Sequence, residues 1–320
     1  MRRGHDGHVD LEPYRGELVT YCYRMVGSFH EAEDLVQDTM LRAWKARDRY
    51  DGTRASVRTW LYRIATNVCL SALEGRARRP LPSGLGAPSD DPAAPLTPAF
   101  DIPWLEPFPD ARFDAEVRGD MRLALMAAMQ VLRPRQRAVL VLRDVLEFSA
   151  AEVATQLGTT VTAVNSTLQR ARAALTDVVD AGEISEPADA ETRTVIARYV
   201  RAFDSADVPA LVQLLTDDAV LEMPPVPLWY RGRRDYGLFM RRVFEMRGTG
   251  WGMRRLTANG QPALAAYAPK AGGGLVLHTL QVITVTGGQV ATNVVFADPR
   301  VFEAFALPTQ ISLDELRQTR

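Results

Sequence analysis

The sequence contains few cysteines and no long hydrophobic run. Its only cysteines are Cys22 and Cys69, and both lie within apolar patterns of helical spacing. Neither has a Cys or His at metal-ligand spacing, so we expect two buried free thiols in a reducing compartment and no metal site. No apolar run approaches the length of a membrane span, and the charged N-terminus precedes no apolar core. These absences predict a cytoplasmic protein without a membrane partner.

The charge of the chain is nearly balanced but unevenly distributed. The net charge of −1 and the isoelectric point near 6.5 give no indication of a nucleic-acid partner. Two stretches are nevertheless rich in arginine: residues 54–79, in which Glu74 is the only acid, and residues 133–172. Local basic patches can bind DNA even when the total charge cancels. The length of 320 residues predicts two or three domains, each with its own core.

Composition changes along the chain indicate where these domains begin and end. Residues 10–79 have apolar residues at helical spacing interrupted by glycines, which predicts a helical bundle. Residues 80–112 are rich in Pro with Ser, Gly and Asp, which is typical of an extended linker. Trp104 and Phe108 are unusual in a pure tether and indicate a further role for the segment around them. Helical periodicity returns over residues 113–180, before a short acidic joint at 182–189.

The last part of the chain, residues 190–310, has a different pattern. Helical segments are predicted near its beginning, followed by β-branched runs at residues 274–286 and 289–297. Gly287 and Gly288 between these runs are a two-residue hairpin signal. Helices first and antiparallel strands later favour an α+β domain with helices on one face of the sheet.

The most specific motif covers residues 132–175. Ser149 and Glu152 form a capping box that begins a short helix, and Gly158 ends this helix before a second one, as in a helix-turn-helix. Four apolar residues at helical spacing would bury one side of the second helix. The outward residues, which have the chemistry to read base edges and hold phosphates, are Asn165, Ser166, Gln169 and Arg170. An ordinary three-helix module with a solvated polar face is the alternative.

Two helical segments in residues 30–79 carry further candidate surfaces. The first surface combines acids and an amide on one helical stripe, which suits a basic partner helix, and its polar residues are Asp34, Gln37 and Asp38. The second combines charge, an aromatic ring and an amide, as capture of single-stranded DNA requires, and consists of Trp60, Arg63 and Asn67. Taken separately, the first surface could be a solvated face, and Trp60 could be a core residue.

Together these segments resemble the extracytoplasmic-function (ECF) group of the sigma-70 family. The core-polymerase-binding helix of that family is similar to EAEDLVQDTMLRAW, its promoter-melting helix to RTWLYRIATNV, and its −35 domain to LRPRQRAVLVLRDVLEFSAAEVA with the helix that follows. The resemblance implies a multidomain protein with two all-α sigma domains, a helical bundle (region 2, residues 10–79) and a helix-turn-helix (region 4, residues 113–180), joined by the linker at 80–112. It implies no catalytic residue, metal or cofactor.

The resemblance also assigns a role to each surface. The residues expected on the clamp helices of the β′ subunit of RNA polymerase core are Asp34, Gln37 and Asp38. The residues expected at the −10 element of promoter DNA are Trp60, Arg63 and Asn67. The residues expected at the −35 element are Asn165, Ser166, Gln169 and Arg170. Many relatives carry basic residues where Asn165 and Thr167 stand here, and the sequence does not indicate whether an anti-sigma protein binds.

Residues 190–310 resemble the SnoaL-like branch of the nuclear-transport-factor-2-like superfamily, a cone-shaped sheet around a pocket. The resemblance rests on the order of elements, the segment WYRGRRDY and the closing hairpin. Enzymes of this superfamily use a pocket carboxylate or His with a donor for the developing oxyanion. The candidates here are His278, Asp218, Glu222 and Tyr230, and spacing ties no set of them together. We therefore expect a regulatory domain that modulates the sigma domains, with a small molecule as a candidate ligand.

Two other functions are compatible with parts of this pattern. A one-component regulator also combines a helix-turn-helix with a ligand-binding domain, but it does not need residues 30–79 and would not co-purify with polymerase. A bifunctional protein whose C-terminal domain is an isomerase or cyclase would lose turnover on His278→Ala.

Overall fold

The computed structural model describes residues 10–179 and 190–318. The charged N-terminal residues and the predicted acidic joint at 182–189 lie outside the described residues. Contacts divide the chain into two compact units. The described part of the first contains residues 10–78, 113–119 and 124–179, and that of the second contains residues 79–112, 120–123 and 190–318. The residues predicted as a linker, 80–112, thus belong to the second unit.

The first half of the first unit is a helical bundle. Gly27, with φ of 71°, ends one helix, and Ser28 caps the next by accepting a hydrogen bond from the Glu31 amide at 3.2 Å. Ser56 caps the third long helix in the same way. The helices are η1 (Glu12–Tyr14), α1 (Arg15–Val26), α2 (Phe29–Ala46), η2 (Arg47–Arg49) and α3 (Val57–Leu73).

The second half of the unit contains the predicted helix-turn-helix. The capping box is formed: the Ser149 amide donates to Glu152 Oε2 at 2.8 Å, and the Glu152 amide donates to Ser149 Oγ at 3.2 Å. Gly158, with φ of 60°, ends the first helix of the motif. The elements are α4 (Ala115–Arg118), α5 (Leu123–Met129), α6 (Pro134–Leu140), η5 (Val141–Val145), α7 (Ala150–Leu157) and α8 (Val161–Val179).

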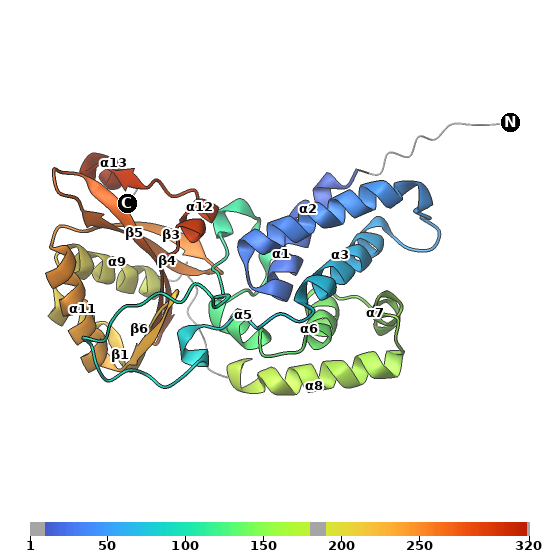
Figure 1. Ribbon diagram of the computed structural model, residues 1–320, viewed down its shortest axis with the longest axis horizontal. Coiled ribbons are helices and arrows are strands. Elements are labelled where there is room, and N and C mark those ends of the chain that lie inside the picture. Colours follow the sequence, from blue (N-terminus) through green and yellow to red (C-terminus); the bar gives the residue numbers. More distant parts are fainter. Residues whose placement is uncertain (1–9, 180–189, 319–320) are drawn as a thin grey trace. The chain divides into compact units, whose positions relative to one another are not determined.

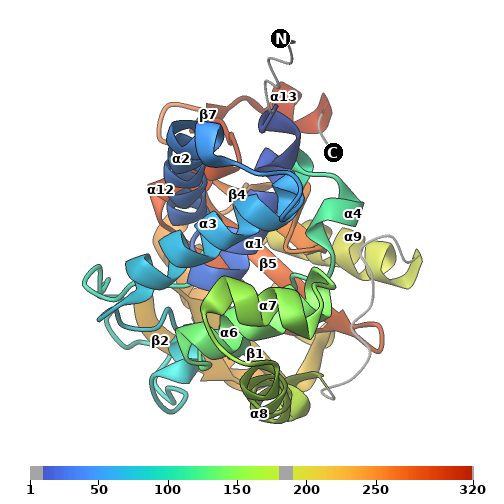
Figure 2. The ribbon, with the colours of Figure 1, turned by 90° about the vertical axis from the view of Figure 1, so that its right-hand side faces the viewer.

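The two halves pack together through α3, which lies next to α6 and α7 (Figures 1 and 2). The Tyr62 ring meets the Phe148 ring edge-on with centroids 5.4 Å apart. Arg137 on α6 is buried, and its guanidinium donates to the carbonyl of Met25 at the end of α1 and to Gln130 Oε1 at 2.8 Å. It also donates to the carbonyls of Gln130 and Leu132, each at 3.2 Å. One buried cation therefore satisfies acceptors from both halves.

The helices α1 and α3 bring the two cysteines together. Cys22 and Cys69 are buried free thiols, as predicted, and their sulfurs lie 3.5 Å apart. The hydrogen bond with Cys22, together with burial, raises the pKa of the Cys69 thiol well above its ordinary value. The Cys69 thiol therefore stays protonated, and both buried cysteines pack as small apolar side chains.

The second unit is built on a mixed seven-stranded sheet in the order β2-β1-β6-β5-β4-β3, with β7 paired to β5. Strands β1 and β6 run parallel, and the other pairs are antiparallel. Its strands are β1 (Leu215–Met223), β2 (Val226–Arg231), β3 (Gly252–Ala258), β4 (Gln261–Pro269), β5 (Leu275–Thr286), β6 (Gln289–Phe296) and β7 (Gln310–Ile311). Its helices are η3 (Pro82–Gly84), η4 (Asp110–Arg112), α9 (Ala190–Asp204), α10 (Val208–Gln213), α11 (Arg233–Arg247), α12 (Pro299–Ala304) and α13 (Leu313–Gln318).

The sheet separates two hydrophobic clusters, as the alternation along β4 shows. Leu264 and Ala266 belong to the large core under α9 and α11, whereas Ala265 and Tyr267 face Leu316 of α13. Figure 1 shows α9 and α11 together on one side of the sheet. The predicted α+β architecture is confirmed, with the closing hairpin turning at two glycines of positive φ. No helix within residues 10–179 and 190–318 combines the length and apolar character needed to cross a bilayer.

We expect Arg137→Met to lower the free energy of unfolding of the first unit by about 2–4 kcal/mol, because it leaves buried carbonyl oxygens without a donor. Thermal unfolding of the full chain, followed by circular dichroism, measures the effect. Arg135→Met is the matched control, because Arg135 lies on the same helix and is exposed. Equal midpoints for the two variants would contradict the role of the Arg137 hydrogen bonds.

Candidate functional site

The outer face of α8 carries the predicted base-reading residues. Val164, Leu168, Ala171 and Leu175 are buried as one stripe, as predicted. Thr160 caps the helix by accepting the Ala163 amide at 3.2 Å, and Arg172 holds it to η5 through two bonds of 2.7 and 2.8 Å to Asp144. The four residues of the predicted −35 set are all exposed: Asn165, Ser166, Gln169 and Arg170. This exposed polar face, with Arg170 as its cation, has the chemistry to bind in a major groove of DNA.

The predicted polymerase-binding surface lies on α2. Asp34 and Gln37 are exposed, whereas Asp38 is half-buried and forms an ion pair with Arg42, with Nη2 and Oδ2 at 2.9 Å. Two large apolar residues of the same helix stand in solvent: Leu41 is 48% exposed and Trp44 is 55% exposed. Exposed apolar side chains next to acids are typical of a protein contact surface.

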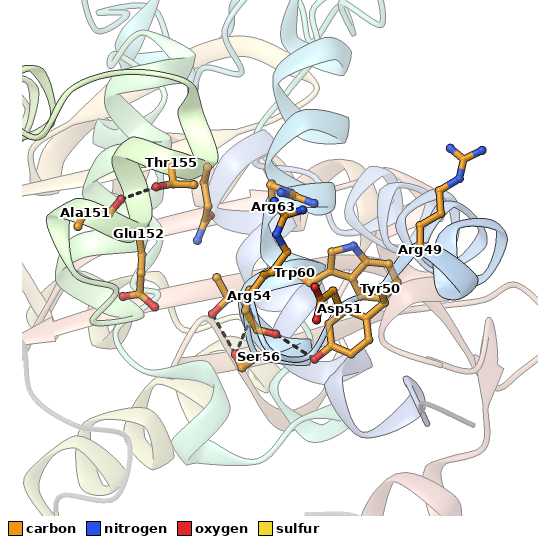
Figure 3. Close-up of a pocket in the computed structure, with 13 residues that line it drawn as sticks. Arg49, Tyr50, Asp51, Arg54, Ser56, Trp60, Arg63, Ala151, Glu152 and Thr155 are labelled. Carbon is orange, nitrogen blue, oxygen red and sulfur yellow. Dashed lines mark hydrogen bonds between the residues drawn. The ribbon is translucent and has the colours of Figure 1, made fainter. Parts of the chain in front are cut away.

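The predicted melting surface on α3 is only partly exposed. Arg63 and Asn67 are exposed, whereas Trp60 is 7% exposed and packs on Tyr50 with ring centroids 5.0 Å apart. Trp60 and Arg63 line a cavity of about 710 Å³ that Glu152 of α7 also lines (Figure 3).

The loop before α3 adds residues to this cavity that sequence reasoning missed. Arg49, Tyr50 and Arg54 line it, together with Asp51. Figure 3 shows Arg54 and Arg63 close to the Trp60 ring, with Glu152 and Thr155 on the opposite wall. The arginine-rich composition of residues 54–79 was the available signal, but the contribution of the loop depends on its folded path. Aromatic rings flanked by guanidinium groups are suited to unstacked bases and phosphates.

The four candidate catalytic residues of the C-terminal domain, residues 190–318, do not form one constellation in the described structure. Asp218 is exposed. Glu222 is buried, which raises its carboxyl pKa, and it accepts the Ser83 amide at 2.9 Å. Burial raises the pKa of Tyr230 to about 12, and its hydroxyl donates to the Asp91 carbonyl at 3.2 Å. Glu222 and Tyr230 therefore bind the segment 80–112 instead of facing a common pocket.

The same segment covers the edge of the sheet at β2. The Ser89 amide donates to the Trp229 carbonyl at 2.8 Å, and the Ala99 amide donates to the Pro225 carbonyl at 2.9 Å. In return, Trp229 Nε1 donates to the Gly86 carbonyl at 3.0 Å. An edge strand exposes backbone groups that would otherwise pair with another chain. Here residues of the segment 80–112 occupy that edge.

A second attachment lies at the turn between β3 and β4. Asn259, in the left-handed region with φ of 57°, accepts the Phe108 amide through Oδ1 at 2.8 Å. Its Nδ2 donates to the Met121 carbonyl at 2.7 Å. Gly260 donates its amide to Asp110 Oδ2 at 2.8 Å. One turn thus holds the chain on both sides of residues 113–119.

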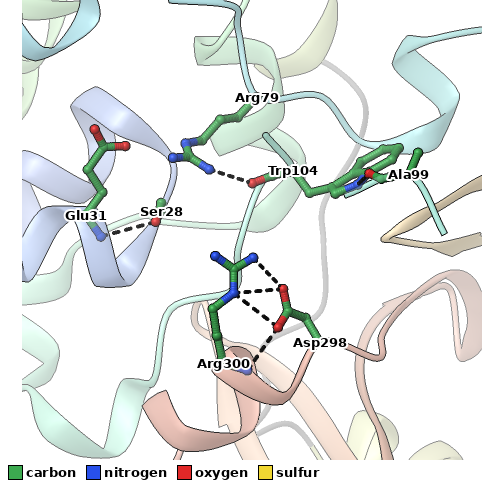
Figure 4. A network of polar contacts seen from close by, with 7 residues as sticks. All are labelled: Ser28, Glu31, Arg79, Ala99, Trp104, Asp298 and Arg300. Atoms are coloured by element: carbon green, nitrogen blue, oxygen red, sulfur yellow. Dashed lines mark hydrogen bonds and ion pairs between the residues drawn. The ribbon is translucent and has the colours of Figure 1, made fainter. Parts of the chain in front are cut away.

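The aromatic part of the linker is buried between these attachments. Leu105 and Phe108 are fully buried, and Trp104 Nε1 donates to the Ala99 carbonyl at 2.8 Å. Arg79 donates to the Trp104 carbonyl at 3.1 Å (Figure 4). In the same view, Arg300 forms an ion pair with Asp298, with Nη2 and Oδ2 2.6 Å apart. The prediction that residues around Trp104 and Phe108 do more than tether agrees with this packing.

Models of three families match the chain. Sigma-70 region 2 matches residues 11–79, Sigma-70 region 4 matches residues 122–175, and the SnoaL-like domain matches residues 196–293. Two sigma-70 domains that carry the surfaces described above define a sigma-70-type protein of transcription initiation.

Similar proteins of known family show which group of sigma-70-type proteins the chain belongs to. The ECF RNA polymerase sigma factor SigG of Mycobacterium tuberculosis is 47% identical over 321 residues, which cover 97% of this chain and 86% of SigG. SigJ of the same species is 30% identical over 218 residues, or 65% of this chain and 62% of SigJ. The crystal structure of SigJ superposes with a TM-score of 0.64 at 25% identity, over 93% of this chain and 98% of the SigJ chain. The chain belongs to the ECF RNA polymerase sigma factors.

The burial of His278 predicts how the stability of the C-terminal domain depends on pH. Burial, with a smaller effect of Arg247, lowers the pKa of His278 to about 4. An unfolded His titrates near 6.5, so the unfolded state binds a proton first as the pH falls. Stability is therefore fully present above about pH 6.5 and is lost progressively towards pH 4. We expect His278→Gln to lose less stability between pH 7 and pH 5 than the unmodified chain. Thermal unfolding midpoints at both pH values measure this, and parallel losses would contradict it.

Proposed function

We propose that the C-terminal domain of this sigma factor is a regulatory module that restrains the linker and thereby lowers affinity for RNA polymerase core. The observation that carries the proposal is the attachment of residues 80–112 at two places, the β2 edge and the Asn259 turn. Fully extended, these residues would span roughly 110 Å. Bound in this way, they leave less free chain for regions 2 and 4 to separate on a polymerase surface.

We infer that the sigma domains act through three surfaces. Asp34, Gln37 and Asp38 bind the β′ clamp helices, and the exposed Leu41 and Trp44 beside them support a protein contact. At the −10 element, bases unstacked from the non-template strand bind at Trp60, Arg63 and Asn67. Each opened step costs about 1.4 kcal/mol, and stacking on an aromatic ring returns about 1–3 kcal/mol. A few captured bases therefore hold a bubble without a catalytic residue.

The state of Trp60 adds a step to this mechanism. Its ring packs on Tyr50 and lines a cavity that α7 also lines. A base reaches Trp60 only when Tyr50 turns aside or stacks with it, and when α7 moves away from α3. The linker must allow this separation, so the linker restraint and the capture of bases are coupled.

The arrangement of side chains favours regulation over catalysis in the C-terminal domain. An acid–base mechanism needs its groups within hydrogen-bond reach of one substrate. Glu222 and Tyr230 are instead engaged with Ser83 and Asp91 of the linker. Because the partner is RNA polymerase core on promoter DNA, the proposed site of action is the cytoplasm.

The −35 role predicts a specific loss of promoter binding. Arg170→Ala is expected to weaken binding of holoenzyme to a promoter by about 1–3 kcal/mol, because it removes a cation able to bind a base and a phosphate. A competition experiment with a promoter fragment measures the change. Thr176→Ala on the exposed face of the same helix is the control. Equal affinities for the two variants would exclude Arg170 from the interface.

The restraint of the linker predicts a gain of function. Arg242 on α11 donates to the carbonyls of Pro92 at 2.9 Å and Ala94 at 2.7 Å. Arg242→Ala should release this part of the linker and raise the affinity for core polymerase about tenfold, or about 1.4 kcal/mol. Titration of core enzyme with labelled sigma factor measures the affinity.

Arg241→Ala is the matched control, because Arg241 is the neighbouring residue and is exposed. An affinity for core that stays the same or falls in Arg242→Ala would refute the proposed restraint.

A further inference from the structure

We propose that the C-terminal domain binds a small, uncharged, apolar molecule with one hydrogen-bond donor, such as a phenol or alcohol, and that this molecule competes with Leu96 of the linker. The proposed binding site depends only on the cavity described below. The proposed effect of the ligand on regulation depends, in addition, on the proposed restraint of the linker.

The cavity lies between α11 and the sheet. Its volume is about 160 Å³, and its apolar walls include Phe203, Leu221, Phe239, Met240 and Trp251. An apolar protein cavity of roughly 150 Å³ stays free of water and takes up benzene. The size and the walls therefore select a molecule with a single ring or a short branched chain.

One end of the cavity carries a buried acceptor. Asn293 lines the cavity and is 1% exposed. Its Nδ2 lies 3.0 Å from the Tyr199 hydroxyl and 2.9 Å from the Tyr236 hydroxyl. Nδ2 also donates to Gln281 Oε1 at 3.0 Å.

The oxygen of this amide belongs to a residue that lines the cavity. Of the three partners of Nδ2, Gln281 also lines the cavity, whereas Tyr199 and Tyr236 are not among the described residues that line it. Asn293 Oδ1 is buried and has no hydrogen-bond partner in the described part of the chain. Buried polar atoms are rarely left unpaired in native proteins. A ligand hydroxyl that donates to Oδ1 supplies the missing bond.

The other polar residues of the lining are Arg247, His278, Thr279 and Gln281. Arg247 is exposed, so its charge is solvated. His278 lies beside Trp251, with ring centroids 5.5 Å apart. Burial keeps its imidazole neutral near pH 7. Because the buried polar groups of the lining are uncharged, they offer little to compensate the desolvation of a charged ligand. The ligand class is therefore neutral.

Leu96 connects the cavity to the linker. It is half-buried, lines the cavity and packs on the core of the C-terminal domain. The linker is attached on both sides of it, through Arg242 to the Ala94 carbonyl and through the Ala99 amide to Pro225. A ligand that takes the place of the Leu96 side chain pushes out the segment between these attachments. Occupancy of the cavity then loosens the linker.

Calorimetry with two matched probes tests the site on the full-length protein. p-Cresol carries a donor, and 4-methylanisole replaces that hydroxyl with a methyl ether. We expect p-cresol to bind about tenfold more tightly, because only it donates to Asn293 Oδ1. Asn293→Leu should remove the difference. Failure of p-cresol to bind overturns the site, and equal affinities in the unmodified protein overturn the role of Asn293.

Leu96→Ala tests the competition without touching the polar end of the cavity. Removing the competing side chain should raise the affinity for p-cresol about threefold or more. Leu85→Ala is the control, because Leu85 lies in the same linker and is 46% exposed. Saturating p-cresol should also speed hydrogen exchange of the amides of residues 89–99.

Each outcome of these tests separates the two proposals. Binding of p-cresol without faster linker exchange, or with equal effects of Leu96→Ala and Leu85→Ala, refutes the competition and leaves the site. The affinity of Arg242→Ala for core is measured without any probe. It therefore decides the proposed restraint independently of the ligand.

Discussion

The structure depends on how a proline-rich segment satisfies its backbone polar groups. Proline lacks an amide proton and interrupts helices and central strands, so such a segment cannot pair its own groups in regular elements. Its remaining amides and carbonyls must bond to water or to another part of the protein. Here they bond to the β2 edge and to the Asn259 turn. The same bonds complete an exposed sheet edge and decide that residues 80–112 belong to the C-terminal unit.

The sigma surfaces have a different physical origin, because each depends on a single amphipathic helix. A buried stripe on α8 fixes the direction of its polar face, and the same reasoning applies to α2 and α3. The polar faces of α2 and α8 are therefore exposed in the free chain, whereas Trp60 of the α3 surface is buried and packs on Tyr50. The proposed regulation therefore acts on the distance between the surfaces, through the linker that joins them.

Local features were predictable from the sequence, and long-range ones were not. The capping box at Ser149, the stripe on α8 and the turn at Gly287 involve residues a few positions apart, so periodicity shows them. Strand β4 was not predicted, because its alanine-rich sequence, QPALAAYAP, lacks the β-branched residues that mark a strand. The contact between Cys22 and Cys69 and the bond from Ser83 to Glu222 join residues far apart in the chain. No spacing rule reaches across such distances.

Candidate catalytic residues were the least predictable, because residue type alone does not tell what a side chain faces. Glu222 and Tyr230 have the chemistry of an acid–base pair and lie on the two strands of the β1–β2 hairpin. Glu222 pairs with Trp229 and Tyr230 with Leu221, so the two side chains point to opposite faces of the sheet. Their partners are nevertheless backbone groups of the linker. The domain thus uses polar groups at one edge of its sheet to hold a segment of chain. The cavity under α11 is apolar apart from a few polar groups, and Leu96 of the attached segment is one of its lining residues. This shared residue is the basis of the proposed competition between a ligand and the linker.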